Sequence, residues 1–352
     1  MMRVAVIGAG QWGPGLIRNF HDRRRSEVRW VVDLDPARLE AVRSRFPEIL
    51  VSRDAGKALG DPAVDAVVVA TPTMTHFGIV RRALQSGKHV LVEKPITADS
   101  VQAEELCALA ESARRVLMVG HVFLYNPSVR WVKRYLDEAG LGRVYYISAV
   151  RVSHGPVRAD VNAAWDLAAH DISVVSYWLD AEPLSATAAG GSWLKAGNED
   201  AVFATLGYPG GILLNLQSSW LSPCKVRQIT VVGEEGLLTF DDMSLSEPVR
   251  IHRKPARGAG DGPGYLDSFA SFRTGPGEGE IEVPRFAGHE PLKAECDHFL
   301  DCIEGGQSPL TGGRSGLAVV RALEMIERAL RANGREEPVG RAGPEACLTS
   351  PS

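Results

Sequence analysis

The first 120 residues alternate short apolar runs with segments of helical periodicity. The apolar runs, rich in β-branched residues, lie at 3–8, 28–33, 66–71, 89–94 and 116–120. Helix-like segments lie between them, near 14–24, 36–45, 76–86 and 99–114. Strands that stay apolar along their length are buried on both faces, which is typical of a parallel sheet covered by crossover helices. This part of the chain therefore predicts an α/β domain.

After residue 120 most strand-like runs follow one another directly. A helix near 127–138 leads into runs at 143–153, 201–208, 211–220 and 226–233, with one apolar helical stretch at 165–179. This succession predicts an α+β domain with a large open, mostly antiparallel sheet packed by a few helices. We expect a surface excursion at 253–285 and a last helix near 315–333 that docks back on the body. The expected boundaries are 1–121, 122–337 and a tail at 338–352.

Composition excludes several classes of function. The 352 residues are 45% hydrophobic and 23% charged with a net charge of −4, as in an ordinary globular protein of two domains. No basic stripe suits nucleic acid, and no apolar run reaches the roughly 18 residues that span a bilayer. Scattered cysteines without a CxxC motif and the lack of a signal peptide predict a cytoplasmic protein. Cys296 and His298 lie about 200° apart on a helix, so we expect no metal.

A glycine-rich turn follows the first strand. The stretch VAVIGAGQWGPGL places Gly8, Gly10 and Gly13 in G-x-G-x-x-G spacing, directly after the strand and at the start of a helix. In this context the glycines permit a tight turn, and the helix N-terminus faces a pyrophosphate. We therefore predict a dinucleotide site that also includes Gln11 and Trp12.

The second strand indicates which dinucleotide binds. Asp33 ends this strand, where a carboxylate accepts hydrogen bonds from the adenosine ribose. A 2′-phosphate would meet that negative charge, and Leu34 offers no cation to offset it. NAD is therefore predicted rather than NADP.

Further polar segments follow later strands, at the edge where open α/β sheets bind ligands. ATPTMTHFG follows the run at 66–71, VEKPIT ends the run at 89–94, and a histidine follows the run at 116–120. Lys94 lies between a predicted buried strand and a proline, which is unusual for a solvent-exposed lysine and indicates a functional role. The alternative is that Lys94 is an ordinary lysine in a turn. The coenzyme-binding residues predicted from these segments are Thr71, Pro72, His76, Glu93, Lys94 and His121.

The stretch WDLAAHDISVVSYWL places Asp166 and His170 four residues apart, hence on one face of a predicted α-helix. A buried histidine satisfied by a neighbouring aspartate and a catalytic pair both fit this spacing. In the second case His170, with an ordinary pKa near 6.5, would act as an acid/base.

Taken in order, the glycine turn, ATPTMTH, VEKP and DLAAH resemble the Gfo/Idh/MocA oxidoreductases over nearly the whole chain. The resemblance implies a Rossmann domain followed by an open-sheet domain that forms a sugar pocket. It places Lys94 beside the reacting carbon, gives Asp166 and His170 the catalytic positions of the second domain, and lets Glu93 and Pro95 shape the loop near the nicotinamide. It also implies a homodimer or homotetramer.

A narrower resemblance concerns the substrate. Stretches such as WGPGLIRNF and GPVRADVNAAWDLAAHDIS look like those of nucleotide-sugar dehydrogenases related to UDP-N-acetylglucosamine 3-dehydrogenases, which serve aminosugar or antibiotic-sugar pathways. We therefore expect hydride transfer from a secondary carbinol, at C3, to NAD. Asp166 could orient His170 or bind a sugar hydroxyl. Candidate substrate-binding residues are Arg158, Asn162, Asp166, Lys225 and Arg227.

Four alternatives remain open at this stage. Oxidation of a free inositol or hexose would use the same residues, and so would the reverse reaction, reduction of a 3-keto-sugar. Relatives that cleave glycosides through transient oxidation share the fold. A dinucleotide-gated regulator is the non-enzymatic alternative, and the presence of both Lys94 and His170 argues against it.

Overall fold

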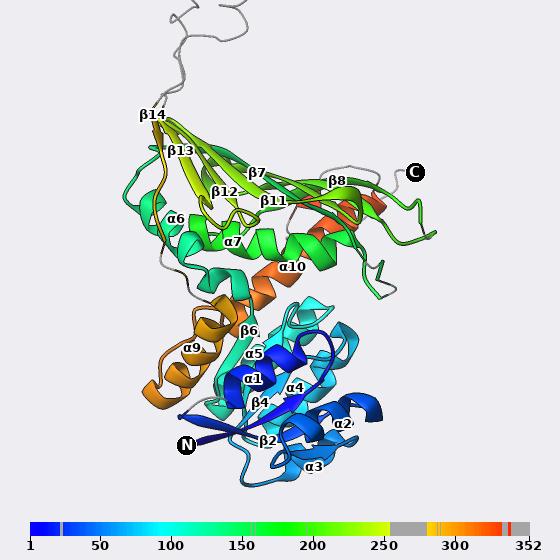
Figure 1. Ribbon diagram of the computed structural model, residues 1–352. Coiled ribbons are helices and arrows are strands. Elements are labelled where there is room, and N and C mark those ends of the chain that lie inside the picture. The colour runs from blue at the N-terminus through cyan, green and yellow to red at the C-terminus, as the bar shows by residue number, and fades with distance from the viewer. Residues whose placement is uncertain are drawn as a thin grey trace, which may run out of the picture.

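The computed structural model describes residues 1–21, 24–155, 157–158, 160–194, 196–253, 280–286, 288, 290–332 and 337–338. Two domains lie one above the other, the first blue to cyan and the second mainly green to yellow in Figure 1. Most of the predicted surface excursion, 254–279, and nearly all of the predicted tail, 339–352, lie outside the described residues.

Six parallel strands form the sheet of the first domain, in the order β3-β2-β1-β4-β5-β6. They are β1 (Met2–Ile7), β2 (Ser26–Val32), β3 (Leu50–Ser52), β4 (Ala66–Val69), β5 (His89–Glu93) and β6 (Leu117–Gly120). The helices are α1 (Gly13–His21), α2 (Pro36–Arg45), α3 (Ala55–Gly60), α4 (His76–Gln85) and α5 (Ser100–Ala113). All five predicted runs form strands, whose central residues are buried, as throughout β4. The sequence pattern missed the short elements β3 and α3.

The strand order of this sheet determines where a ligand can bind. The chain passes from β1 outward to β2 and β3, then returns to the other side of β1 with β4. At such a reversal the loops diverge and leave a crevice outside the carboxyl ends of the strands. The glycine turn follows β1, the ATPTMTH segment follows β4, and the VEKP segment ends β5, so all three meet at this edge.

The second domain contains a nine-stranded sheet, in the order β14-β13-β12-β11-β7-β10-β9-β8-β15. Neighbouring strands are antiparallel except for the parallel pair β10 and β7, which confirms the predicted open, mostly antiparallel sheet. The strands are β7 (Val144–His154), β8 (Ser185–Gly191), β9 (Ala201–Gly207), β10 (Leu213–Ser219), β11 (Leu221–Gly233), β12 (Gly236–Asp241), β13 (Val249–Arg253), β14 (Glu280–Glu282) and β15 (Glu337–Pro338).

Helices link the two domains. α6 (Pro127–Asp137) and α7 (Ala169–Leu179) lie between the large sheet and the first domain, as Figure 1 shows. α9 (Pro291–Gly305) returns to pack on α1, where the rings of Phe20 and Phe299 meet edge to face at 6.2 Å. α10 (Gly313–Arg331) contacts α5 and β6 below and α7 and β8 above. The last helix therefore docks on both domains at once.

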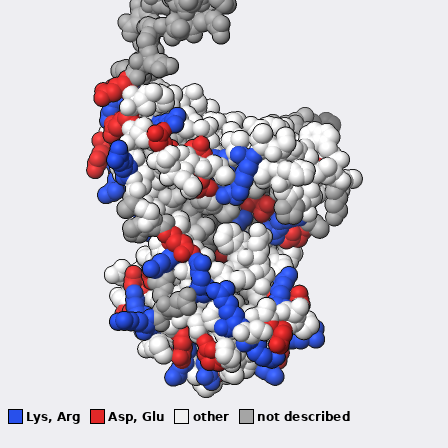
Figure 2. All heavy atoms as spheres, viewed as in Figure 1, with Lys and Arg blue, Asp and Glu red and all other residues white. Residues whose placement is uncertain are grey.

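The surface carries charges of both signs. On the face displayed in Figure 2, Lys and Arg are interspersed with Asp and Glu over the first domain. Within the described part of the chain, no helix has the length and apolar character needed to cross a bilayer.

Candidate active site

The glycine turn after β1 is built from close backbone contacts. Gly8 has φ +104°, a conformation that favours glycine, and a Cβ there would clash with the carbonyl group of Ala70. A Cβ on Gly13 would clash with the carbonyl oxygen of Gly8. The turn therefore needs glycine at both positions, and α1 begins directly at Gly13 with its free amide groups toward the crevice.

A cavity of about 930 Å³ opens at this turn. Seven residues predicted for the coenzyme line it: Gly8, Gly10, Gln11, Trp12, Asp33, Thr71 and Pro72. The second domain contributes Arg158 and Asp160. A cavity of this size between a glycine turn and a carboxylate suits an extended dinucleotide, so the residues present fit NAD.

Asp33 is held in a defined orientation at the end of this cavity. Its Oδ2 accepts a hydrogen bond from the amide of Ala9 at 2.7 Å, and its Oδ1 accepts one from the amide of Asp35 at 2.9 Å. Arg38 Nη1 lies 3.4 Å from Asp33 Oδ2, and Arg38 and Arg53 also line the cavity. Leu34 offers no cation, as predicted from its residue type, but α2 brings Arg38 close to Asp33, which the sequence pattern did not reveal.

His76 is placed as a link between two loops. It is buried, with Nδ1 2.8 Å from the carbonyl oxygen of Pro95 and Nε2 2.8 Å from that of Thr71. Burial lowers its pKa, with the two carbonyl contacts opposing. His76 is not among the residues that line the coenzyme cavity, so it holds the loops after β4 and β5 together.

Lys94 connects the first domain to the second. Its ammonium donates a hydrogen bond to the carbonyl oxygen of Asp166 at 2.7 Å and lies 3.6 Å from Asp166 Oδ1. The Asp166 carboxylate also lies 3.4 Å from Arg158 Nη1 and accepts a hydrogen bond from Trp220 Nε1 at 3.2 Å. Burial lowers the pKa of Lys94, while the carboxylates of Asp166 and Glu93 oppose this.

The helix that carries Asp166 and His170 differs from the prediction. Residues Ala164–Ala168 form a π-helical turn, and the α-helix begins only at Ala169. π-turns are rare and frequent at functional sites. Here the Asp166 carbonyl oxygen accepts a hydrogen bond from Lys94. Among the residues described, no hydrogen bond joins Asp166 to His170. The predicted α-helical geometry at Asp166 is therefore wrong, and the Asp166 carboxylate lies with Lys94, Arg158 and Trp220.

The surroundings of His170 keep it neutral. Burial lowers its pKa well below 6.5, and the positive charges of Lys94 and Arg151 lower it further. Arg151 forms a two-point ion pair with Asp171, with Nε at 3.0 Å and Nη2 at 2.7 Å. The Arg151 guanidinium also lies 4.8 Å from the centre of the Phe123 ring, which meets the His170 ring edge to face. A neutral imidazole can accept a proton at pH 7.

The predicted substrate-binding residues divide into two groups. Arg158 lines the coenzyme cavity and lies beside Asp166, and the charge of Arg227 acts on His170. Asn162, in contrast, is buried, donates to Glu199 at 3.0 Å and so supports the local loop. Lys225 is exposed in the irregular part of β11, and no contact places it with Arg227.

Reasoning from the sequence named Arg227 but missed the charged cluster near His170 to which it belongs. Its members are Arg151, Asp171, Arg227 and Asp242, and Arg227 Nη1 lies 3.2 Å from Asp242 Oδ2. One signal could have revealed it. Arg151 occupies the inward side of β7, in line with the buried Ile147 and Ala149, where a cation needs a buried partner.

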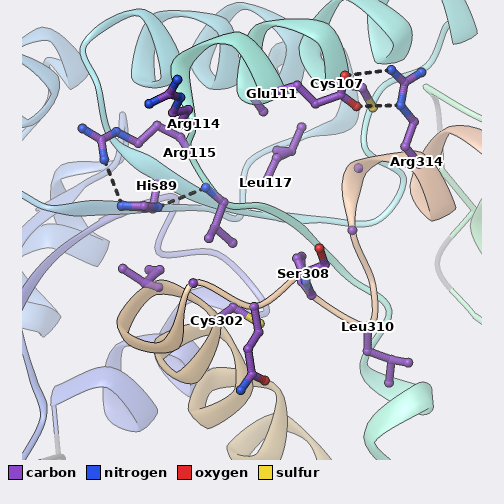
Figure 3. A pocket seen from close by; sticks show the side chains of 18 of the residues that line it. His89, Cys107, Glu111, Arg114, Arg115, Leu117, Cys302, Ser308, Leu310 and Arg314 are labelled. Carbon is purple, nitrogen blue, oxygen red and sulfur yellow. Dashed lines mark hydrogen bonds and ion pairs between the residues drawn. The ribbon is translucent and has the colours of Figure 1, made fainter.

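A separate cavity of about 680 Å³ lies between α5, β6 and the loop before α10 (Figure 3). None of the predicted site residues lines it. His89 accepts a hydrogen bond from the amide of Val116 at 3.0 Å, and Arg314 donates to Glu111 at 2.9 Å. In the described part of the chain, no group of three His, Cys, Asp or Glu side chains is placed to hold a metal ion.

Comparisons with known proteins agree with this geometry. Residues 2–121 match the oxidoreductase family with an NAD-binding Rossmann fold, and residues 129–239 match the GFO/IDH/MocA C-terminal domain. The chain is 29% identical over 342 residues to UDP-N-acetylglucosamine 3-dehydrogenase of Acidithiobacillus ferrooxidans, which covers 94% of this chain and 98% of that protein. A solved structure of that enzyme gives a TM-score of 0.80 at 26% identity, covering 94% of this chain and 98% of that chain.

Two further relatives cover nearly the whole chain. Inositol 2-dehydrogenase of Rhizobium meliloti is 26% identical, over 94% of this chain and 96% of its own. The structure of GenD2 from gentamicin A biosynthesis, in complex with NAD, has a TM-score of 0.79 at 26% identity and covers 97% of both chains. Because both domains match in order along the sequence, the chain belongs to the Gfo/Idh/MocA family and is an NAD-dependent oxidoreductase.

Proposed function

We propose that this enzyme oxidises a secondary hydroxyl, at C3, of a nucleotide-activated sugar in aminosugar or antibiotic-sugar biosynthesis. The observation that carries the proposal is the contact between Lys94 and Asp166, which joins the two domains beside a half-buried, neutral His170. It is supported by the likeness to a UDP-N-acetylglucosamine 3-dehydrogenase along 94% of the chain.

Each side chain has one proposed role in the reaction. NAD, when bound, accepts the hydride from the carbinol carbon. His170 takes the hydroxyl proton, and its lowered pKa keeps it unprotonated and ready at neutral pH. Lys94 donates a hydrogen bond to the developing alkoxide and stabilises its charge. Asp166 holds the Lys94 ammonium in place rather than orienting the imidazole.

The nucleotide diphosphate needs cationic partners. Arg158 suits this role because it lines the coenzyme cavity next to Asp166, and Arg227 suits it because it lies close enough to act on His170. Lys225 and Asn162 have less support, since one is exposed and the other holds a loop. We also propose assembly as a homodimer or homotetramer, because the outer face of the large sheet exposes Tyr146, Phe203 and Leu213.

Oxidation of a free inositol is the second candidate function. It is favoured by the likeness to inositol 2-dehydrogenase of Rhizobium meliloti at 26% identity. Lys94 and His170 would have the same roles in this reaction. They would also have the same roles in the reverse reaction, the reduction of a keto-sugar. The two candidates differ only in whether the arginines meet a diphosphate.

A substrate screen tests the proposal. The enzyme is incubated with NAD⁺ and, in separate wells, UDP-, dTDP- and GDP-linked sugars, myo-inositol and glucose, and NADH is followed by absorbance. We expect the fastest reaction with a nucleotide sugar. His170→Ala should lower its kcat by about 10²–10⁴-fold while NAD affinity changes by no more than a few-fold. A faster reaction with inositol, or an unchanged kcat in the variant, would contradict the proposal.

A further inference from the structure

In the described part of the chain, the His170 imidazole lacks the hydrogen bond that often fixes an acid/base histidine. Such a bond joins one ring nitrogen to a carboxylate or a backbone carbonyl, and it sets the tautomer and the orientation of the ring. Here Nδ1 of His170 is buried without a hydrogen-bond partner, and the Asp166 carboxylate lies toward Lys94. The orientation of the imidazole therefore depends on another contact.

The ring of Phe123 contacts the His170 ring directly. The two ring centroids lie 4.8 Å apart and the ring planes meet at 77°, an edge-to-face pair within the favoured range of about 4.5–7 Å. Such pairs favour particular orientations because the face of an aromatic ring is negative and its edge is positive. The contact can therefore hold the orientation of the imidazole as well as fill the space beside it.

Phe123 is in turn held by a buried cation. The guanidinium carbon of Arg151, on β7, lies 4.8 Å from the centre of the Phe123 ring, inside the roughly 6 Å at which a cation is attracted to an aromatic face. Arg151 is fixed by its two-point ion pair with Asp171. Because Asp171 directly follows His170 in α7, these contacts run from Asp171 through Arg151 and Phe123 back to the neighbouring His170.

The backbone also gives Phe123 a fixed place between the domains. It lies in a 3₁₀ turn, Val122–Tyr125, which follows β6 and leads into α6. The amide of Asn126 donates a hydrogen bond to the carbonyl oxygen of Phe123 at 3.0 Å. The Asn126 side chain accepts one from the amide of Ser128, at the start of α6, at 2.9 Å. The segment that links the two domains therefore carries the ring that contacts His170.

We propose that Phe123 is a positioning residue, which orients the His170 imidazole by ring contact and is supported by Arg151 and Asp171. The inference rests on the proposed dehydrogenase function, in which His170 takes the hydroxyl proton. A general base acts only when its acceptor nitrogen lies within hydrogen-bond reach of that proton. An imidazole held in one orientation meets this condition more often than one that turns freely, so the fixed ring gives a faster reaction.

The surroundings of His170 give the proposal a second measurable consequence. Burial is the largest cause that lowers the pKa of His170, and four further groups lower it by their charge: Lys94, Arg151, His121 and Arg227. Three of these groups have carboxylate partners, which are Asp166, Asp171 and Asp242. A smaller side chain at position 123 admits water to the imidazole, so the pKa of His170 should then rise toward its ordinary value.

The test compares Phe123→Leu, which removes the ring, with Phe123→Tyr, which keeps it. Each variant is assayed over a range of pH with NAD⁺ and the sugar that reacts fastest in the screen above. We expect Phe123→Leu to lower kcat about 10-fold, to move the acid limb of kcat/KM to higher pH and to leave KM for NAD⁺ unchanged. Phe123→Tyr should recover most of the lost kcat, because it restores the ring contact.

A second group of the same three side-chain types provides the matched control. The ring of Phe46 meets that of His21 edge to face at 4.7 Å, and the guanidinium carbon of Arg45 lies 5.1 Å from the centre of the Phe46 ring. These residues lie at the ends of α1 and α2, and none of them lines the coenzyme cavity. Phe46→Leu removes the same kinds of contact and should change neither kcat nor the pH profile.

Combined substitutions separate positioning from a structural role. If Phe123 acts through the imidazole, Phe123→Leu has no further effect on kcat in a His170→Ala enzyme. General damage to the fold would instead lower kcat by a similar factor in both backgrounds. A Phe123→Leu kcat within about two-fold of the wild type, or an equal loss in the His170→Ala background, would overturn the positioning role and leave the dehydrogenase function intact.

The pKa of His170 can also be measured without substrate. NMR titration of the histidine ring signals reports it, with His170→Ala used to assign the signal. We expect the His170 signal to titrate at higher pH in Phe123→Leu than in the wild type, and at an unchanged pH in Phe46→Leu. If no sugar reduces NAD⁺, the proposed function fails. An unchanged pKa of His170 in Phe123→Leu would independently overturn the role of Phe123.

Discussion

The Arg151 side chain is buried near His170, and among the described residues it has one ion-pair partner, Asp171. The side chains of Arg151 and Asp171 are 4% and 3% exposed, and Nη1 of Arg151 has no hydrogen-bond partner. Arg151→Met should therefore lower the free energy of unfolding by about 3–5 kcal/mol, because it leaves the Asp171 carboxylate buried and unpaired. Urea denaturation measures this loss.

The same substitution should also raise the pKa of His170, because one of the cations that lower it is removed. The acid limb of kcat/KM should then move to higher pH. Adding Asp171→Leu to Arg151→Met should recover most of the stability, since an apolar pair replaces an unpaired charge. The exposed pair of Arg250 and Glu247 is the control, and Arg250→Met should change stability by less than about 0.5 kcal/mol. An equal loss of unfolding free energy in Arg151→Met and Arg250→Met would contradict the interpretation that Asp171 is left buried and unpaired.

At the scale of single elements, the parallel strands could be predicted because burial on both faces leaves a continuous apolar run. β3 has only three residues, so it is too short to show a hydrophobic periodicity. β8 (Ser185–Gly191) consists mainly of small residues, which have a low β-strand propensity. The π-turn at Ala164–Ala168 could not be predicted, because it coincides with a lysine from the other domain that takes a helix carbonyl.

The candidate site could be predicted from the sequence where its residues directly follow strands, as with the turn at Gly8 and the lysine after β5. Contacts that depend on the register of strands distant in the sequence could not be predicted. Arg151 faces Arg227 across β7 and β11, and Trp220 reaches Asp166 from the end of β10. No spacing along the chain encodes these pairs.

Helix α10 packs closely on the first domain at Gly316, and this contact can be tested. A Cβ on Gly316 would lie 2.6 Å from Val119 Cγ2 on β6, so Gly316→Ala forces the helix away from the first domain. We expect a loss of about 1–3 kcal/mol in unfolding free energy by urea denaturation, in spite of the better helix propensity of alanine. Gly78→Ala in α4 is the matched control, because nothing lies within 4 Å of its Cβ, and it should stabilise by up to about 1 kcal/mol. A gain in both variants would show that α10 can shift freely.

For the molecule as a whole, the proposed active site lies where the domains meet, and burial there leaves titratable groups away from water. Lys94 reaches Asp166 across this junction, and Trp165 Nε1 donates to Glu327 of α10 at 3.3 Å. The same burial that lowers the pKa of His170 therefore also makes the stability of the fold depend on pH.

Between pH 6.5 and about 4.5, the folded and unfolded chains bind different numbers of protons. Burial lowers the pKa of five histidines, so the unfolded chain takes up these protons at higher pH than the folded chain; they are His76, His89, His121, His170 and His298. The pKa of Glu93 is raised to about 7, and the pKa values of Glu295 and Asp242 are raised as well, so the folded chain takes up these protons at higher pH than the unfolded chain. The lowered groups outnumber the raised ones, so stability should fall as the pH decreases, by about 1.4 kcal/mol per pH unit for each proton of difference. In Glu295→Gln the folded chain loses one of its protons, so the slope should steepen by about 1.4 kcal/mol per pH unit. Urea denaturation at pH 6.5, 5.5 and 4.5 measures both slopes, and a variant slope equal to or below that of the wild type would show that Glu295 is not protonated in the folded protein.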